Sequence, residues 1–283
     1  MAPTLARPPF HRDGWVLEEK VDGWRIVAWK DGSRVRLVSR NHVDHTRRFP
    51  ELAAAVAKLR PDVLVLDGEV AVFDDQLVSR FGLLGEPDPA VLCTPPMLMA
   101  FDVLQVGAHD VRRLPLRRRR AALEDAIAGS DMVLPVRRLE PDGAAAWATV
   151  ERRGLEGFVA KDPESTYRQG PTRAWVKVKL RREGVFVVGG IRDVDAFDGA
   201  LVGERVGGEL IYRGVVEWGF RAADVLELVR AARYERLRDS PFADLPRMRG
   251  AVWFAPRFHA EVSYAEVLAG KLRAPVWRGI VRR

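Results

Sequence analysis

The 283-residue chain is poor in cysteine, with a single one at position 93. One cysteine excludes a disulfide framework and a four-cysteine zinc site, and we expect Cys93 to be a small buried apolar residue. The first fifteen residues lack the apolar segment of a signal peptide. No stretch approaches the roughly 18 apolar residues needed to cross a membrane. These absences predict a cytosolic protein.

The chain also lacks internal repeats and low-complexity tracts, which favours ordinary globular domains. Apolar residues make up 47% of the sequence and charged residues 30%, so disorder throughout is excluded. The net charge of +7 favours a polyanionic partner such as nucleic acid or a nucleotide. A charge that serves only solubility is the alternative.

The first 180 residues are rich in β-prone segments. We expect strands at 15–20, 24–29, 35–39, 63–73, 97–104, 155–161 and 174–180. The first two are expected to join at a sharp turn near Asp22-Gly23, and Asp31-Gly32 is expected to form a hairpin turn into the third. Pro50 is expected to open a helix, and the four arginines at 117–120 fit the solvated face of another.

The composition changes after about residue 180, where short strands are punctuated by glycine. One helix is expected to begin with Asp224 as its N-cap and to end near Leu237. More short strands are expected between 251 and 264. This pattern predicts a small, separate β-barrel with one helix.

The segment A-W-V-K-V-K-L carries Lys177 and Lys179 two residues apart. On a strand these side chains share one face at about 7 Å, while Val176 and Val178 face the other way, towards a core. Two close ammonium groups repel each other unless an anion or solvent lies between them, so a phosphate is a natural guest. A plain exposed sheet face is the alternative.

Two carboxylates, Glu69 and Glu156, lie in apolar β-rich runs that read L-D-G-E-V-A-V-F and L-E-G-F-V-A-K. A buried carboxylate is costly unless it is paired or bound to a metal. Together with nearby lysines, the pair suggests a Mg²⁺-assisted phosphoryl-transfer or nucleotidyl-transfer site. Structural salt bridges, for instance with Lys20 or Lys161, are the alternative.

Lys20 stands alone in the segment E-E-K-V-D-G-W-R. A nucleophilic lysine must lose its proton before it attacks, and burial with neighbouring cations favours the neutral amine. Lys177, Lys179 and a metal would supply those cations if the strands converge. A P–N bond formed by Lys20 would stay energy-rich, and it would divide one difficult displacement into two easier ones.

Six segments, in order and at fitting spacing, now carry a resemblance: K-V-D-G-W-R (20–25), S-R-N (39–41), L-D-G-E (66–69), F-D-V-L (101–104), E-G-F-V-A-K (156–161) and W-V-K-V-K (175–179). Over nearly its whole length the chain resembles the covalent nucleotidyltransferase superfamily. It is most similar in pattern to bacterial ATP-dependent DNA ligases, especially the compact ligase module of non-homologous end joining.

The resemblance implies an α+β fold in two domains. Residues 1–181 would form a nucleotidyltransferase (adenylation) domain built from antiparallel sheets. Residues 182–283 would form an OB-fold β-barrel, a common binder of nucleic acid. The segments F-V-V-G-G-I, G-F, S-P-F and L-R-A-P-V-W-R-G carry this second part of the resemblance.

The resemblance also assigns roles around the nucleotide. Lys20 would be the nucleophile that becomes adenylated. Glu18 would read adenine through its exocyclic amine, and Phe101 would stack on the base. Arg25 and Arg40 would contact the ribose-phosphate region and the 5′-phosphate of a nick.

The remaining assigned residues would act on phosphates and metal. Glu69 would bind ribose or organise the metal, and Glu156 would be the carboxylate for the divalent ion. Lys177 and Lys179 would hold the α-phosphate. The implied cofactors are ATP and Mg²⁺ or Mn²⁺.

The implied function is sealing of 5′-phosphate/3′-hydroxyl nicks in duplex DNA through a lysyl-AMP intermediate, in repair or end joining. Nicked duplex DNA would be the partner of a monomeric, cytoplasmic, nucleoid-associated enzyme, and a Ku-type end-binding protein stays open as a second partner. An RNA ligase, a GTP-using capping guanylyltransferase and a non-catalytic nucleic-acid binder are the alternatives. An NAD-dependent ligase is disfavoured because its extra N-terminal domain and cysteine zinc site are missing.

One departure from the family lies at the C-terminal end. The last residues read R-G-I-V-R-R, so Val281 stands where the family has an arginine, and the Asp-Lys pair of its R-x-D-K motif is absent. In the family this motif orients the leaving pyrophosphate. We therefore expect impaired self-adenylation from ATP, or a truncated chain, with sealing of pre-adenylated nicks retained. Arg278 or Arg282 is a candidate substitute.

Overall fold

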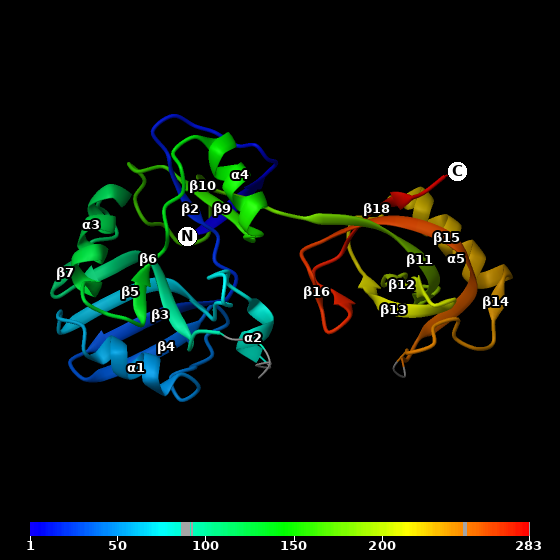
Figure 1. Ribbon diagram of the computed structural model, residues 1–283, viewed down its shortest axis with the longest axis horizontal. Helices are drawn as coiled ribbons and strands as arrows, with labels where there is room; N and C mark the ends of the chain where they lie inside the picture. The colour runs from blue at the N-terminus through cyan, green and yellow to red at the C-terminus, as the bar shows by residue number, and fades with distance from the viewer. Residues whose placement is uncertain (86–90, 92, 246–247, 283) are drawn as a thin grey trace. The chain divides into compact units, whose positions relative to one another are not determined.

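The computed structural model describes residues 1–85, 91, 93–245 and 248–282. The chain divides into two compact units, Met1–Leu180 and Arg181–Arg283 (Figure 1). Each unit has its own hydrophobic core. Among the described residues, no helix has the length and apolar character needed to span a bilayer.

The larger sheet of the first unit has six strands in the order β4-β3-β5-β6-β7, with β8 added parallel to β6 (Figure 1). Its strands are β3 (Trp24–Asp31), β4 (Arg34–Ser39), β5 (Val63–Ala71), β6 (Met97–Val106), β7 (His109–Asp110) and β8 (Val133–Pro135). Helices α1 (Pro50–Ala57) and α3 (Leu116–Ile127) pack on it. The core between the sheet and these helices is mostly aliphatic and includes the aromatic ring of Phe49.

Helix α1 begins as its sequence predicts, with Pro50 in its first turn. A proline has no N–H to leave unpaired there, and its backbone angle already suits a helix. Leu52 and Val56, one helical turn apart, are buried against the sheet. The predicted helix at Pro50 is confirmed.

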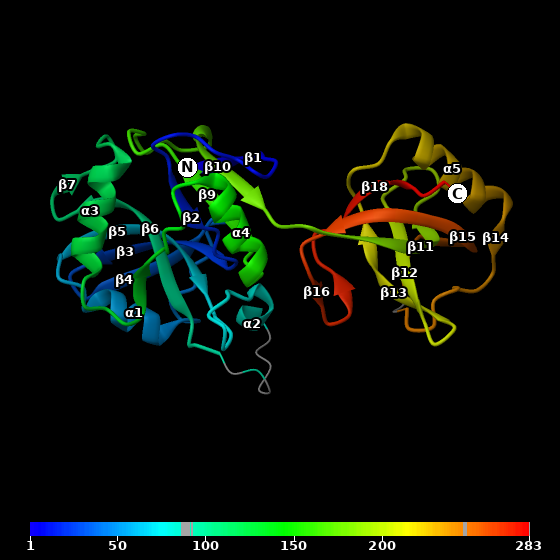
Figure 2. The ribbon, with the colours of Figure 1, turned by 45° about the horizontal axis from the view of Figure 1, so that its top comes forward.

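The smaller sheet of the first unit has four strands in the order β1-β10-β9-β2. They are β1 (Ala2–Ala6), β2 (Val16–Glu19), β9 (Gly157–Lys161) and β10 (Pro171–Lys179), and β1 runs parallel along β10 (Figure 2). Helix α4 (Gly143–Arg153) packs on β9 and β2, and the short α2 (Phe81–Gly85) completes the unit. Asp142 caps α4 by accepting a hydrogen bond from the Ala145 N–H at 2.8 Å.

The hairpin predicted at Asp31-Gly32 is confirmed, because β3 and β4 pair in antiparallel fashion up to Asp31 and Arg34. At Asp22-Gly23, by contrast, the strands that flank the turn, β2 and β3, belong to different sheets. The chain crosses from one sheet to the other at this point. A Cβ at Gly23 would lie 2.1 Å from the Val70 carbonyl oxygen, so only glycine permits the crossing. The K-V-D-G segment therefore places Lys20 at the junction between the two sheets.

The predicted alternation along β10 is confirmed. Val176 and Val178 are buried in a core that β10 shares with β9, β2 and α4. Lys177, on the opposite face, lines a cavity.

Two buried arginines contradict the predicted solvated face at 117–120. Arg119 is fully buried and forms two hydrogen bonds with Asp102, at 2.7 and 2.8 Å. Arg120 is also buried and lies 2.8 Å from Glu18. A run of charge says nothing about burial when carboxylates on other elements neutralise it. The prediction that Cys93 is buried is also wrong, because this residue is exposed.

The second unit is a curved six-stranded sheet in the order β13-β12-β11-β15-β14, with β18 paired to β15 (Figure 2). Its strands are β11 (Arg182–Arg192), β12 (Ala200–Val206), β13 (Glu209–Val216), β14 (Arg236–Leu237), β15 (Ala251–Tyr264) and β18 (Val276–Ile280), with a small ribbon of β16 (Val267–Leu268) and β17 (Lys271–Leu272). Helix α5 (Ala222–Tyr234) packs on β11 and β15.

Three details of the second unit differ from the predictions. The N-cap of α5 is Arg221, and Asp224 is instead buried in the first turn, where it accepts a hydrogen bond from the Trp277 indole N–H at 3.0 Å. The helix ends at Tyr234, short of Leu237. The region 251–264 is one 14-residue strand rather than several short ones.

Candidate active site

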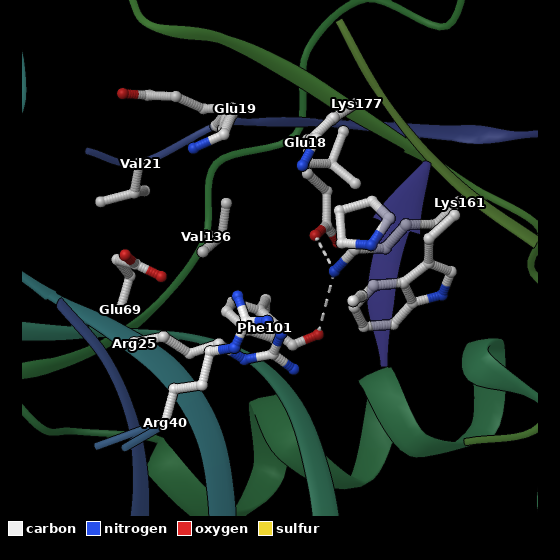
Figure 3. A pocket seen from close by; sticks show the side chains of 15 residues that line it. Glu18, Glu19, Val21, Arg25, Arg40, Glu69, Phe101, Val136, Lys161 and Lys177 are labelled. Carbon is white, nitrogen blue, oxygen red and sulfur yellow. Dashed lines mark hydrogen bonds and ion pairs between the residues drawn. The ribbon is translucent and has the colours of Figure 1, made fainter. Parts of the chain in front are cut away.

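A cavity of about 230 Å³ in the first unit is lined by residues from both sheets (Figure 3). Seven of the nine predicted site residues line it: Glu18, Lys20, Arg25, Arg40, Glu69, Phe101 and Lys177. Of the other two, Glu156 forms an ion pair with Lys20, and Lys179 forms an ion pair with Glu156. The structure therefore brings all nine into one region.

Lys20 follows directly after β2, where its backbone N–H donates to the Gly157 carbonyl at 3.0 Å. A Cβ at Gly157 would lie 2.0 Å from the Val178 carbonyl oxygen, so this glycine allows β9 to approach β10 closely. Its neighbour Glu156 forms an ion pair with the Lys20 ammonium. The two glycines of the K-V-D-G and E-G-F segments thus fix the position of Lys20 from both sides.

Glu156 joins two lysines. Its second oxygen lies 2.9 Å from Lys179 Nζ, and its side chain is only 10% exposed. Burial alone would raise the pKa of Glu156, but Lys20 and Lys179 outweigh it and hold this pKa below its usual range. The carboxylate therefore stays ionised between two ammonium groups.

Lys177 faces the cavity from β10. Its pKa is lowered by burial and by the neighbouring charges of Lys179 and Lys20. Three lysines are thus close enough to act on one another, although the strands that carry them are far apart in sequence. An anion bound among them would relieve their repulsion.

Glu69 lies on β5 at the same cavity. Burial raises the pKa of Glu69 to about 7; Lys20 opposes that shift and the negative charge of Glu156 adds to it. Two carboxylates that are close enough to repel each other suit a hard divalent cation, which prefers oxygen ligands. Glu69 and Glu156 thus fit a Mg²⁺ or Mn²⁺ ion.

The opposite end of the cavity is aromatic. Phe101 on β6 packs edge-on against Trp175, with ring centroids 5.9 Å apart. The Arg25 guanidinium and the Lys161 ammonium lie 5.4 and 4.7 Å from the Phe101 centroid. Glu18 also lines this end, and Figure 3 shows its carboxylate directed at Lys161. An aromatic ring beside a carboxylate acceptor suits a purine with an exocyclic amine.

Arg25 is held in place by β5. Its guanidinium donates two hydrogen bonds to the buried Asp67, at 3.0 and 2.7 Å, and the Tyr167 hydroxyl donates to the same carboxylate at 2.7 Å. Arg40 follows β4 and lines the cavity near Arg25 (Figure 3). These two arginines place positive charge on the side of the cavity opposite Lys177.

Four residues of this region were not predicted as site residues from the sequence. Asp67 had a local signal, since it lies two residues before Glu69 and therefore on the same face of the strand. Lys161 had a weaker signal at the end of E-G-F-V-A-K. Arg120 and Tyr167 had none, because only the tertiary fold brings them beside Glu18 and Asp67.

The fold and the site together define a covalent nucleotidyltransferase, with a lysine of a K-x-D-G segment at a cavity between two sheets and a separate β-barrel after it. The model of the ATP dependent DNA ligase domain matches residues 6–179, and that of the ATP dependent DNA ligase C terminal region matches residues 194–282. The chain therefore belongs to the ATP-dependent DNA ligase family. The predicted family and two-domain fold are confirmed.

Relatives support this assignment. The chain is 31% identical over 276 residues to the multifunctional non-homologous end joining protein LigD of Mycolicibacterium smegmatis, covering 94% of this chain and 36% of LigD. It is 36% identical over 218 residues to DNA ligase C of Mycobacterium tuberculosis, covering 70% and 61% of the two chains. The chain thus spans about a third of the length of LigD.

Two solved structures are similar over nearly the whole chain. The ligase domain of M. tuberculosis LigD is 28% identical, with a TM-score of 0.55, and the match covers 99% of this chain and 95% of that one. A mycobacterial DNA ligase D complexed with ATP and MES is 30% identical, with a TM-score of 0.57 and the same coverage.

Proposed function

We propose that this chain seals 5′-phosphate/3′-hydroxyl nicks in duplex DNA, using ATP through a lysyl-AMP intermediate. One observation carries the proposal: Lys20 lies beside Lys177 and is joined through Glu156 to Lys179, at a cavity whose far end is Phe101 and Glu18. Nucleophile, phosphate-binding cations and base-binding groups are thereby in the order that a nucleotide requires.

In the first step, Lys20 Nζ attacks the α-phosphorus of ATP, a P–N bond forms, and pyrophosphate leaves. Glu156 is placed to accept the proton from the Lys20 ammonium. Lys177 and Lys179 would stabilise the negative charge that develops on the α-phosphate oxygens. Phe101 would stack on adenine, and Glu18 would accept a hydrogen bond from its amine.

In the second step, the 5′-phosphate of the nick attacks the phosphorus of lysyl-AMP and releases the lysine. In the third, the 3′-hydroxyl attacks the activated 5′-phosphate, the strand is joined, and AMP leaves. Arg25, preset by Asp67, and Arg40 would bind the ribose-phosphate and the incoming 5′-phosphate. A divalent metal held by Glu69 and Glu156 would supply further neutralisation of charge at the phosphates.

The two domains would share the DNA. We assign adenylation to residues 1–181 and assign residues 182–283, the OB barrel, to DNA contact. A role in non-homologous end joining is supported by the name of one relative, a multifunctional non-homologous end joining protein, and a Ku-type end-binding protein is a candidate partner.

The decisive experiment is a nick-sealing assay with a labelled duplex, run with ATP, with GTP and with no nucleotide. Sealing with ATP alone supports the proposal, whereas a covalent adduct formed only with GTP would favour a capping enzyme. All-DNA and RNA-containing nicks, compared side by side, separate a DNA ligase from an RNA ligase. A non-catalytic binder would retain nicked DNA in a gel shift without sealing it.

Binding to nicked DNA is expected to weaken steeply with salt. Phosphate contacts by lysine and arginine release counterions, so the affinity should fall about tenfold or more between about 50 and 200 mM salt. Fluorescence anisotropy with a labelled nicked duplex measures this. An affinity that stays constant over the same range of salt would contradict binding of DNA through basic side chains.

Wild-type protein is expected to seal pre-adenylated nicks at least about tenfold faster than it seals the same nick starting from ATP, because Val281 replaces the arginine that would orient pyrophosphate. Rapid-quench sealing assays on the two substrates give the ratio. The Val281→Arg variant should lower the ratio of these two sealing rates, because it should accelerate only the reaction that starts from ATP. Equal wild-type rates would show that other residues orient pyrophosphate.

A further inference from the structure

Tyr167, in the connection between β9 and β10, makes a contact that the proposed chemistry does not use. Its hydroxyl donates a hydrogen bond to the Asp67 carboxylate at 2.7 Å, and Asp67 is 0% exposed. The same carboxylate accepts two hydrogen bonds from Arg25, at 3.0 and 2.7 Å. Tyr167 and Asp67 are not among the described residues that line the cavity, but Arg25 is. One buried carboxylate therefore joins Tyr167 to a residue of the site.

The surroundings of Tyr167 hold its hydroxyl in one place. Its backbone N–H donates to the Arg112 carbonyl at 2.8 Å, and the N–H of Leu116, where α3 begins, donates to the Ser165 carbonyl at 2.9 Å. The segment that carries Tyr167 is therefore fastened to the start of α3. Burial and the charge of Asp67 raise the pKa of Tyr167 above its usual value, so the hydroxyl keeps its proton and remains a donor.

The contact with Asp67 determines how the Arg25 guanidinium is presented. Asp67 accepts hydrogen bonds from Nε and Nη2, which form one edge of this planar group. A contact with two parallel hydrogen bonds fixes the plane of the guanidinium and leaves the Nη1 group for a ligand. The Arg25 side chain is 27% exposed and lines the cavity. Arg25 is thus held from behind and directs its free donors forward.

The place of Arg25 suits the phosphate of the nick better than the α-phosphate of the nucleotide. Figure 3 shows Arg25 and Arg40 together on one wall of the cavity, with Lys177 on the opposite wall. Lys177 lies on β10, in the same sheet as the strand that precedes Lys20, so the α-phosphate is expected on that side. The arginines on the other wall are left for the second anion, the 5′-phosphate that arrives in the second step.

We propose that Tyr167 is a positioning residue, which acts through Asp67 to orient Arg25 for the 5′-phosphate of the nick and so controls the transfer of AMP to DNA but not self-adenylation. This inference rests on the proposed function. No bond to Tyr167 forms or breaks in the reaction. Without the hydroxyl, the Asp67 carboxylate would lose one of its three hydrogen bonds, and Arg25 would no longer be held in a single orientation. A small displacement of a phosphate-binding group is enough to slow the step that it serves.

The test compares wild type with Tyr167→Phe, which removes only the hydroxyl, and with Tyr212→Phe. Tyr212 is a matched control, because it is a buried tyrosine of the second unit, 6% exposed, whose ring packs against Phe242. Rapid-quench assays measure adduct formation from ATP and, separately, transfer of AMP from preformed lysyl-AMP to a nick. Tyr167→Phe should slow the transfer about tenfold or more and leave adduct formation within about twofold of wild type. Tyr212→Phe should change neither rate.

A second measurement separates positioning from a general loss of structure. Fluorescence anisotropy without divalent metal compares nicked duplexes that carry a 5′-phosphate or a 5′-hydroxyl, and the preference for the phosphate should fall at least about fivefold in Tyr167→Phe. If that variant does not fold, Asp67→Asn replaces it, with the same expected losses. An unchanged transfer rate, equal slowing of both rates, or an unchanged preference for the 5′-phosphate would overturn the inference. A wild-type protein that forms no adduct with ATP would instead refute the proposed function.

Discussion

Replacing Lys20 with alanine is expected to abolish the covalent nucleotide adduct and to reduce ATP-dependent nick sealing by a factor on the order of 10⁴ or more. The amine of Lys20 is the atom that would form the P–N bond, and no neighbour can replace it. Lys177 is held on β10, a different strand, and Lys179 does not line the cavity. Intact-mass spectrometry after incubation with ATP, together with a sealing assay, measures both losses.

The same variant distinguishes a nucleophile from a residue that merely binds DNA. A pre-adenylated nick no longer needs the lysine to carry AMP, so Lys20→Ala should still seal this substrate within about tenfold of the wild-type rate. Lys30→Ala, which removes a buried lysine outside the cavity, should keep the adduct. An adduct that survives in Lys20→Ala would place the nucleophile elsewhere and refute the proposed mechanism.

The elements that the sequence predicted well are those whose signals are local. Pro50 and the helical spacing of Leu52 and Val56 predict α1, and the alternation of valine and lysine predicts both faces of β10. The turn between β2 and β3 lies near Asp22-Gly23, as predicted, but an Asp-Gly pair favours a tight turn whether or not the flanking strands share a sheet. Whether the flanking strands then pair with each other depends on partners such as β9 and β5, which are distant in sequence.

The site shows the same limit. A charged side chain in an apolar strand indicates a function, and this signal is present at Lys20, Glu156 and Lys179. That the three side chains lie together was only a hypothesis from the sequence, and the fold shows that they do. The burial of Arg120 could not be predicted from the local sequence. A run of arginines is typical of a solvated face, and only the buried Glu18 on another element explains why this one is inside. Resemblance, rather than spacing, indicated the role of Phe101.

Glu156→Gln is expected to lower the rate of adduct formation by about 10² to 10³-fold. The carboxylate holds Lys20 with one oxygen and Lys179 with the other, and burial does not prevent its ionisation because the two lysines keep its pKa low. A neutral amide would leave two ammonium groups facing each other, would not accept the Lys20 proton, and would be a poorer ligand for a divalent metal. The defect should therefore appear in kcat as well as KM.

Glu164→Gln provides the matched control, because Glu164 is a carboxylate of the same unit that forms an exposed ion pair with Arg117 at 2.6 Å. An exposed pair contributes little, about 0 to 1 kcal/mol, so this variant should adenylate at the wild-type rate. Raising the Mg²⁺ or Mn²⁺ concentration should recover part of the Glu156→Gln rate if the carboxylate binds metal, and none of it if Glu156 only orients the lysines. Wild-type adenylation by Glu156→Gln at every metal concentration would show that the ion pair joining Lys20 to Lys179 is structural, and the catalytic role assigned to Glu156 would have to be abandoned.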